Sequence, residues 1–78
     1  MANEPHDRVM AGQIWKDRDA RMTNRLVRVI RCEGGFAFCE EGYEAHGEYH
    51  AHSRQGKPAR IRMDRMKPTG GSFQPWTR

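Results

Sequence analysis

Residues 25–39 read RLVRVIRCEGGFAFC, and this stretch decides the fold. Its first half is rich in valine and isoleucine, whose β-branched side chains favour a pleated strand over a helix. Gly34-Gly35 follows, and glycine adopts the positive φ angles of a tight turn without steric cost. The run FAFC after the turn is also β-prone. The stretch therefore predicts an antiparallel hairpin, with a two-turn helix capped by Thr23 or Asn24 as the alternative.

The register of this hairpin stays open at the level of sequence. A two-residue turn sets Ile30 opposite Cys39, whereas a four-residue turn sets Val29 opposite Phe38. A slip of one residue moves every side chain of a strand to the other face of the sheet. The two registers therefore predict different cores.

Further strand signals flank the hairpin. Residues 12–16 form a short β-prone segment, and residues 17–19 (Asp-Arg-Asp) favour a turn after it. Residues 59–64 alternate cleanly, so that Ile61 and Met63 face one way while the charged side chains between them face the other. These signals predict a first strand before the hairpin and a further strand after it.

The remaining stretches complete one domain at residues 12–78. Residues 73–76 predict a final edge strand, residues 1–11 a flexible lead, and residues 44–58 a long loop. Four or five short strands joined by tight turns cover their apolar face only by curling. The expected fold is therefore all-β: a small SH3-like barrel or a strongly bent antiparallel sheet.

The chain has 78 residues, enough for one domain with a modest core. A cavity large enough for catalysis would remove core that so small a domain needs. No set of residues stands out as catalytic or cofactor-binding. We therefore expect a binding module rather than an enzyme, and no cofactor.

Basic residues outnumber acidic ones, 14 to 10, and they are concentrated in two segments, residues 21–31 and 57–67. The stretch between the two segments is acidic. Side by side, the two basic segments would form a face suited to phosphates or to an acidic protein. The alternative is a solvated surface on which arginines pair with Glu40 and Glu41 across the hairpin.

Arginine binds phosphate through a planar fork of N–H donors, and an aromatic ring can stack on an unpaired base. The candidate nucleic-acid-binding residues combine these side-chain types: Arg21, Arg25, Arg28, Arg31, Arg60, Arg62, Arg65, Lys67 and Trp15. Trp15 has a second interpretation, because a tryptophan in a first strand commonly lies in the core. Nothing in the sequence separates DNA from RNA.

Two motifs resemble a known family. Residues 12–21 (GQIWKDRDAR) are similar to a Gly-x-x-Trp-x-Asp-x-Asp-x-Arg opening, followed by Arg-x-x-Arg-Val at residues 25–29. Residues 60–69 (RIRMDRMKPT) are similar to an Arg-Ile-x-x-x-Arg-hydrophobic-x-Pro-Thr closing segment. The family comprises small uncharacterised proteins of actinobacteria and their phages. The resemblance implies a small β-domain with no assigned activity and is compatible with a phage or mobile-element origin. The His- and Glu-rich residues 44–55 depart from the family pattern.

A protein-interaction module is the alternative function. A phage- or mobile-element-encoded protein would dock on a host protein through an apolar rim of Trp15, Tyr43, Phe73 and Trp76. No stretch approaches the roughly 20 apolar residues that span a bilayer, and no secretory signal precedes the domain. We therefore expect a cytoplasmic protein, in the host cytoplasm if phage-encoded, without a membrane partner. The oligomeric state is not indicated.

Three smaller groups of residues have alternative interpretations. His46, His50 and His52 are spaced so that a folded loop could hold Zn²⁺ or Ni²⁺, although the spacing matches no standard site and we expect no metal. Protonation of these histidines could instead make binding depend on pH. The carboxylates at 17 and 19 favour turn formation over metal binding, with Arg21 as a salt partner. The cysteines at 32 and 39 suit a reduced core, and a disulfide is the alternative.

Overall fold

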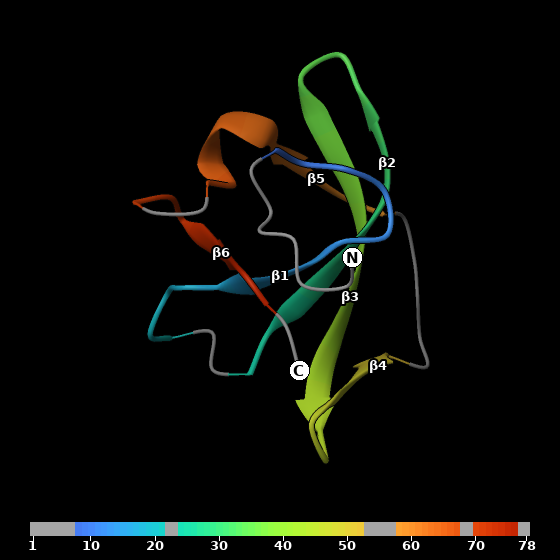
Figure 1. Ribbon diagram of the computed structural model, residues 1–78, viewed down its shortest axis with the longest axis vertical. Coiled ribbons are helices and arrows are strands. Elements are labelled where there is room, and N and C mark those ends of the chain that lie inside the picture. The colour runs from blue at the N-terminus through green and yellow to red at the C-terminus, as the bar shows by residue number, and fades with distance from the viewer. Residues whose placement is uncertain (1–7, 22–23, 53–57, 68–69, 77–78) are drawn as a thin grey trace.

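The computed structural model describes residues 8–21, 24–52, 58–67 and 70–76 (Figure 1). The described chain forms six strands and one short 3₁₀ helix, η1. Their bounds are β1 Ile14–Asp17, β2 Leu26–Glu33, β3 Phe36–Ala45, β4 Glu48–Ala51, β5 Ala59–Arg62, η1 Met63–Arg65 and β6 Phe73–Pro75. The expected all-β class is confirmed, with six strands rather than four or five.

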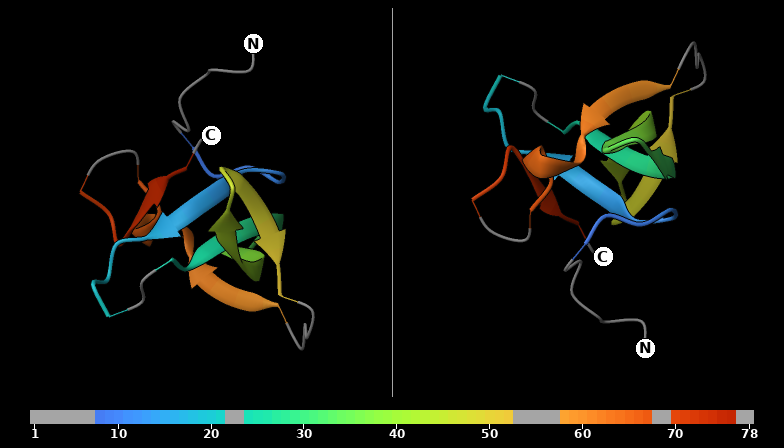
Figure 2. Two further views of the ribbon diagram at one scale, coloured as in Figure 1. Left: turned by 90° about the horizontal axis from the view of Figure 1, so that it is seen from below. Right: turned by 90° about the horizontal axis from the view of Figure 1, so that it is seen from above.

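All six strands belong to one antiparallel sheet in the order β4-β3-β2-β1-β6, and β5 also pairs with β3. Figure 2, viewed along the direction of β3, shows the strands crossing one another rather than lying in a plane. The described strands β5 and β6 do not pair; the only bridge near them joins Met66 to Phe73. The molecule is therefore a strongly bent sheet that is not closed into a barrel.

The β2–β3 hairpin is built around a two-residue turn. Gly34 and Gly35 both have positive φ angles, 60° and 83°, and Glu33 pairs with Phe36. The two-residue register holds as far as Arg31, opposite Phe38. A bulge then shifts the pairing, so that Val29 rather than Ile30 lies opposite Cys39. Neither predicted register is correct along the whole hairpin, because one strand contains an extra residue.

The core lies on the inner side of the bent sheet. Its main cluster draws on five strands, on the segment before β1 and on the residue after η1: Val9, Trp15, Val27, Val29, Ala37, Cys39, Ile61, Met66 and Phe73. The alternation expected for residues 59–64 is confirmed as far as β5, where Ile61 is buried between two exposed arginines. Met63 packs against the cluster from η1, which replaces the end of the expected strand.

The predicted flexible lead is too long. Val9 is buried in the core, and the N–H of Gly12 donates to the Val29 carbonyl at 2.8 Å. The Gln13 side chain accepts from the Met10 N–H, at 2.9 Å, and from the Trp15 Nε1–H, at 3.0 Å. The packed domain therefore includes residues 9–11, which the sequence assigned to the lead; residues 1–7 lie outside the described residues.

The prediction of a loop at residues 44–58 is wrong for residues 44–51, most of which lie in strands. There β3 continues to Ala45, and β4 returns after a two-residue turn at His46 and Gly47, whose φ angles are 56° and 76°. Two consecutive positive φ angles are the geometry of the tightest hairpin turns. The ring of Tyr49 also covers Gly42, which places β4 against β3. Residues 53–57 of the predicted loop lie outside the described residues.

Candidate nucleic-acid interface

The outward side of β3 carries two phenylalanines. Ala37 and Cys39 point inward and are fully buried, so the alternation of the strand turns Phe36 and Phe38 to the other side. Both phenylalanines are half-buried. All four residues of the sequence FAFC are apolar. The strand buries the two small side chains and directs the two large ones outward.

Arginines flank Phe38 on both sides within one register row. Arg31 of β2 and Arg60 of β5 are the direct cross-strand partners of Phe38. Partners in a ladder project to the same face. The Arg31 guanidinium carbon lies 4.0 Å from the centroid of the Phe38 ring, and that of Arg60 lies 4.7 Å from the Phe36 ring. The row therefore places two guanidinium groups on aromatic faces.

Two neighbouring rows extend this surface. Phe36 lies between Glu33 and Arg62, and Arg28 lies opposite Glu40. These rows direct arginine and phenylalanine side chains away from the core. We call this group the outer face: Arg28, Arg31, Phe36, Phe38, Arg60 and Arg62. The two basic segments of the sequence thus meet on one face, through two arginines from each.

The β-bulge at Ile30 makes this convergence possible. Residues 28 and 31 are three apart, and in a regular strand they would project to opposite faces. Because Ile30 is an extra residue, Arg28 pairs with Glu40 and Arg31 with Phe38, which are two apart and share a face. Bulges redirect side chains in this way.

Carboxylates accompany three of the four arginines. Arg28 pairs with Glu40 at 2.8 Å, Arg62 pairs with Asp64 at 3.0 Å, and Arg31 pairs with Glu33. The side chains of Glu33 and Asp64 are 71 % and 61 % exposed, so their ion pairs are solvent-screened and contribute little. Glu40 is more enclosed, and Arg28 also lies 5.7 Å from the centroid of the Tyr49 ring. Within the described chain, Arg60 has no carboxylate partner.

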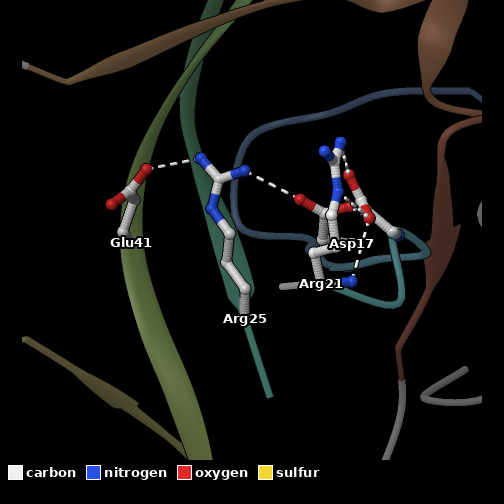
Figure 3. Close-up of polar contacts among 5 residues, drawn as sticks. Asp17, Arg21, Arg25 and Glu41 are labelled. Carbon is white, nitrogen blue, oxygen red and sulfur yellow. Dashed lines mark hydrogen bonds and ion pairs between the residues drawn. The ribbon is translucent and has the colours of Figure 1, made fainter. Parts of the chain in front are cut away.

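Arg25 does not belong to the outer face. Its guanidinium reaches from the start of β2 to Asp17 on one side and to Glu41 on the other (Figure 3). Burial lowers the pKa of Arg25, but the hydrogen bonds to Glu41 and Asp17 outweigh it and the pKa rises overall. With both edges of its fork occupied, Arg25 ties strands together and is unsuited to binding phosphate.

The prediction that Trp15 binds nucleic acid is wrong. It is 0 % exposed and belongs to the main core cluster, so its ring is inaccessible to a nucleic-acid base. The same burial removes Trp15 and Phe73 from the apolar rim considered for a protein partner. Of that rim, Tyr43 is exposed and Trp76 is half-buried.

The other predicted basic residues lie away from the outer face. Arg21 follows β1 and pairs with Asp19 at 2.9 Å. Arg65 lies in η1 and lines a cleft beside β5, and Lys67 is exposed after Met66, beyond the strands that form the face. Five of the nine predicted side chains therefore lie off the outer face.

Asp17 and Asp19 form the turn that the sequence predicts for them. The Asp19 N–H donates to Asp17 Oδ1 at 2.9 Å, and the Arg21 N–H donates to Asp19 Oδ1 at 2.9 Å. Hydrogen bonds from the Arg21 side chain and backbone hold the pKa of Asp19 below its usual value. With Trp15 in the core and Asp17 on Arg25, the Trp-x-Asp-x-Asp-x-Arg motif holds the fold together.

The three histidines considered as metal ligands do not form one group. His50 and His52 lie against the Tyr43 ring, at centroid distances of 5.6 and 5.3 Å, whereas His46 occupies the β3–β4 turn. Among the residues that the structure describes, no three His, Cys, Asp or Glu side chains are grouped to hold a metal ion. Both cysteines are free: Cys39 is buried and Cys32 is exposed.

Phe36 and Phe38 are candidate binding residues that sequence reasoning missed. They were expected only as strand formers, although an aromatic pair separated by one small residue, next to arginine-bearing strands, is a usable signal for a stacking surface. Their outward direction depends on the bulge, which the sequence does not reveal.

Comparisons with protein-family models, with curated proteins and with solved structures returned no match. In the described ranges, the structure contains no helix long and apolar enough to cross a membrane.

Proposed function

We propose that this protein is a non-enzymatic module that binds single-stranded nucleic acid on its outer face. The observation that carries the proposal is the row Arg31–Phe38–Arg60, which joins the two basic segments across three strands. Small β-domains commonly bind ligands along a strand face, but the proposal rests on these side chains rather than on the fold.

The exposed ion pairs leave the arginines available to phosphate. A phosphate oxygen accepts the same bidentate hydrogen bonds as a carboxylate. Glu33 and Asp64 are largely exposed and can rotate away into water at little cost, which frees Arg31 and Arg62. Arg60 needs no such exchange. Phosphate contacts release counterions from the nucleic acid, which supplies most of the affinity.

The stacked geometry favours unpaired bases over a duplex. The guanidinium carbons of Arg31 and Arg60 lie over phenylalanine rings, 4.0 and 4.7 Å from the ring centroids, so arginine and aromatic groups adjoin on one surface. Bases stack on guanidinium planes and on aromatic rings when they are splayed out of a helix. In a duplex the base faces are covered by their neighbours, so Arg31, Arg60 and the phenylalanines could not stack on them.

A salt titration with matched variants tests the proposal. Fluorescence anisotropy would follow labelled single-stranded and duplex oligonucleotides of equal length at increasing salt. For single strands the slope of log K against log salt is about −0.7 per phosphate contact, so four arginine contacts predict about −3. The variant Arg31→Gln/Arg60→Gln should bind more weakly, with a slope shallower by about 1.4.

The control is Arg8→Gln/Arg21→Gln, which removes the same charge from exposed positions off the outer face. It should retain most of the affinity and nearly the full slope. Equal losses in the two variants would show a general charge effect and overturn the assignment to the face, as would salt-insensitive binding. A complex with a protein that survives nuclease and high salt, without oligonucleotide binding, would favour the protein-interaction alternative.

A further inference from the structure

A second feature lies where the sheet fails to close. A cleft of about 600 Å³ separates β5 and η1 from the end of β1 and the start of β6. Clefts of roughly 300–1,000 Å³ are the size that small ligands occupy. The outer face does not include this cleft, although Arg60 borders both.

The aspartates of the cleft are already engaged. Asp17 Oδ2 accepts from Arg25 at 2.8 Å, and its Oδ1 accepts from the Asp19 N–H at 2.9 Å. Asp19 accepts from the Arg21 side chain through both carboxylate oxygens. Each aspartate of the cleft is therefore paired with an arginine, Asp17 with Arg25, which also binds Glu41, and Asp19 with Arg21.

Arginines remain in excess around the same cleft. Arg18, Arg60 and Arg65 line it, and across the described ranges none of the three pairs with a carboxylate. Arg18 donates one Nη1 hydrogen bond to the Gly71 carbonyl at 3.3 Å, which leaves its other donors for a ligand. The cleft is thus bordered by more cations than anions, and because the Arg60 guanidinium lies over the Phe36 ring, Arg18 and Arg65 are the arginines best placed to bind a ligand.

Three apolar side chains also line the cleft. Ile61 and Phe73 belong to the core cluster and also border the cleft, beside Ala59. A ligand that fits both parts carries a charged phosphate for the arginines and a flat, weakly polar ring for the apolar wall. Nucleotides combine these two groups.

We propose that the cleft binds the terminal phosphate and the base of a nucleotide. Two sources have this chemistry: a free mononucleotide, and the phosphorylated end of a nucleic-acid strand whose path crosses the outer face at Arg60. The inference rests on the cleft alone and goes beyond the proposed function.

NMR titration of the whole chain with adenosine monophosphate, adenosine and inorganic phosphate tests the site. The amide signals of Ile61 and Phe73 should shift with the nucleotide. Adenosine, which lacks the phosphate, should bind at least about tenfold more weakly, the change expected for losing a hydrogen bond to a charged group. Arg65→Gln and Arg18→Gln should each weaken nucleotide binding by about tenfold.

Arg8→Gln is the matched control, because Arg8 is exposed, does not belong to the outer face and does not line the cleft. It should leave nucleotide affinity unchanged, and the spectra confirm that each variant is folded. Shifts spread over all basic surfaces, or equal weakening by Arg8→Gln and Arg65→Gln, would overturn the proposal.

Oligonucleotides with and without a 5′- or 3′-phosphate separate the two sources. Tighter binding of a phosphorylated end, lost in Arg65→Gln, assigns the cleft to strand ends; equal binding with nucleotide affinity intact assigns it to free nucleotide. Nucleotide binding without oligonucleotide binding would support the cleft proposal and refute the proposed function of the outer face. Oligonucleotide binding without nucleotide binding would support the function of the outer face and refute the cleft proposal.

Discussion

The Arg25 guanidinium and the Asp17 carboxylate form a 2.8 Å ion pair at the junction of β1 and β2, where the Asp17 side chain is only 8 % exposed. The second edge of the Arg25 fork binds Glu41 of β3. One side chain thus connects three consecutive strands. This bridge fixes the end of β1, from which the Asp17–Asp19 turn and one wall of the cleft extend.

Replacing Arg25 by methionine should destabilise the domain by about 2–4 kcal/mol, because Asp17 would stay enclosed without its cation. Urea denaturation measures the loss. Arg21→Met removes an arginine–aspartate pair of the same type at a fully exposed position and should leave the unfolding midpoint unchanged. Equal destabilisation by both substitutions would contradict the structural role assigned to Arg25.

Gly42→Ala should displace β4. A Cβ at this position would lie 2.3 Å from the His50 carbonyl oxygen and 2.6 Å from the Tyr49 ring, and the backbone carbonyl cannot move without breaking the ladder. We expect a loss of stability of about 2 kcal/mol or more and faster amide exchange in residues 48–51. Gly34→Asn is the control, since a side chain there meets nothing within 4 Å and asparagine tolerates a positive φ angle. Normal exchange in β4 of the alanine variant would refute this packing.

The two thiols should differ sharply in reactivity. Burial, followed by the effect of Cys32, raises the pKa of Cys39 to about 12, so almost no thiolate forms at pH 8. Cys32 is exposed. A thiol reagent at pH 8 should label one cysteine rapidly and the second only on unfolding, and peptide mass spectrometry identifies which. Rapid labelling of Cys39 in the folded protein would contradict its burial.

Tyr49 should make stability depend on alkaline pH. Burial, together with the neighbouring Glu40 carboxylate, raises the pKa of its phenol above the usual 10.0. Stability from a raised phenol pKa is fully present below pH 10 and is lost as the pH rises towards the folded-state pKa. The difference in unfolding free energy between wild type and Tyr49→Phe should therefore be constant to about pH 9 and shrink above pH 10. A difference independent of pH up to 11 would rule this out.

The sequence predicted the parts of the fold that depend on local preference. β-Branched residues before Gly34-Gly35 and the alternation around Ile61 indicate strands wherever they are placed. The β3–β4 hairpin was missed because its turn, His46-Gly47, resembles no strong turn signal, and because the packing of Tyr49 on Gly42 is a tertiary contact.

The candidate interface was predicted only in outline. The sequence marks which segments are basic, but the direction of each side chain depends on register. Arg25 and Arg28 are three apart, as are Arg28 and Arg31, yet only the second pair shares a face. Trp15 could be either core or surface until the first strand is placed between β2 and β6.

The extra residue at position 30 has a consequence for evolution. Deleting Ile30 would restore a regular ladder in which Arg28 and Arg31 stand two residues apart, so both would still point to the same face. The surface therefore tolerates the loss of this residue without any change in the arginines. Regular pairing of the strand with Ile30 retained would instead turn Arg28 and Arg31 to opposite faces. A descendant that loses one residue here should be recognisable by arginines two positions apart instead of three.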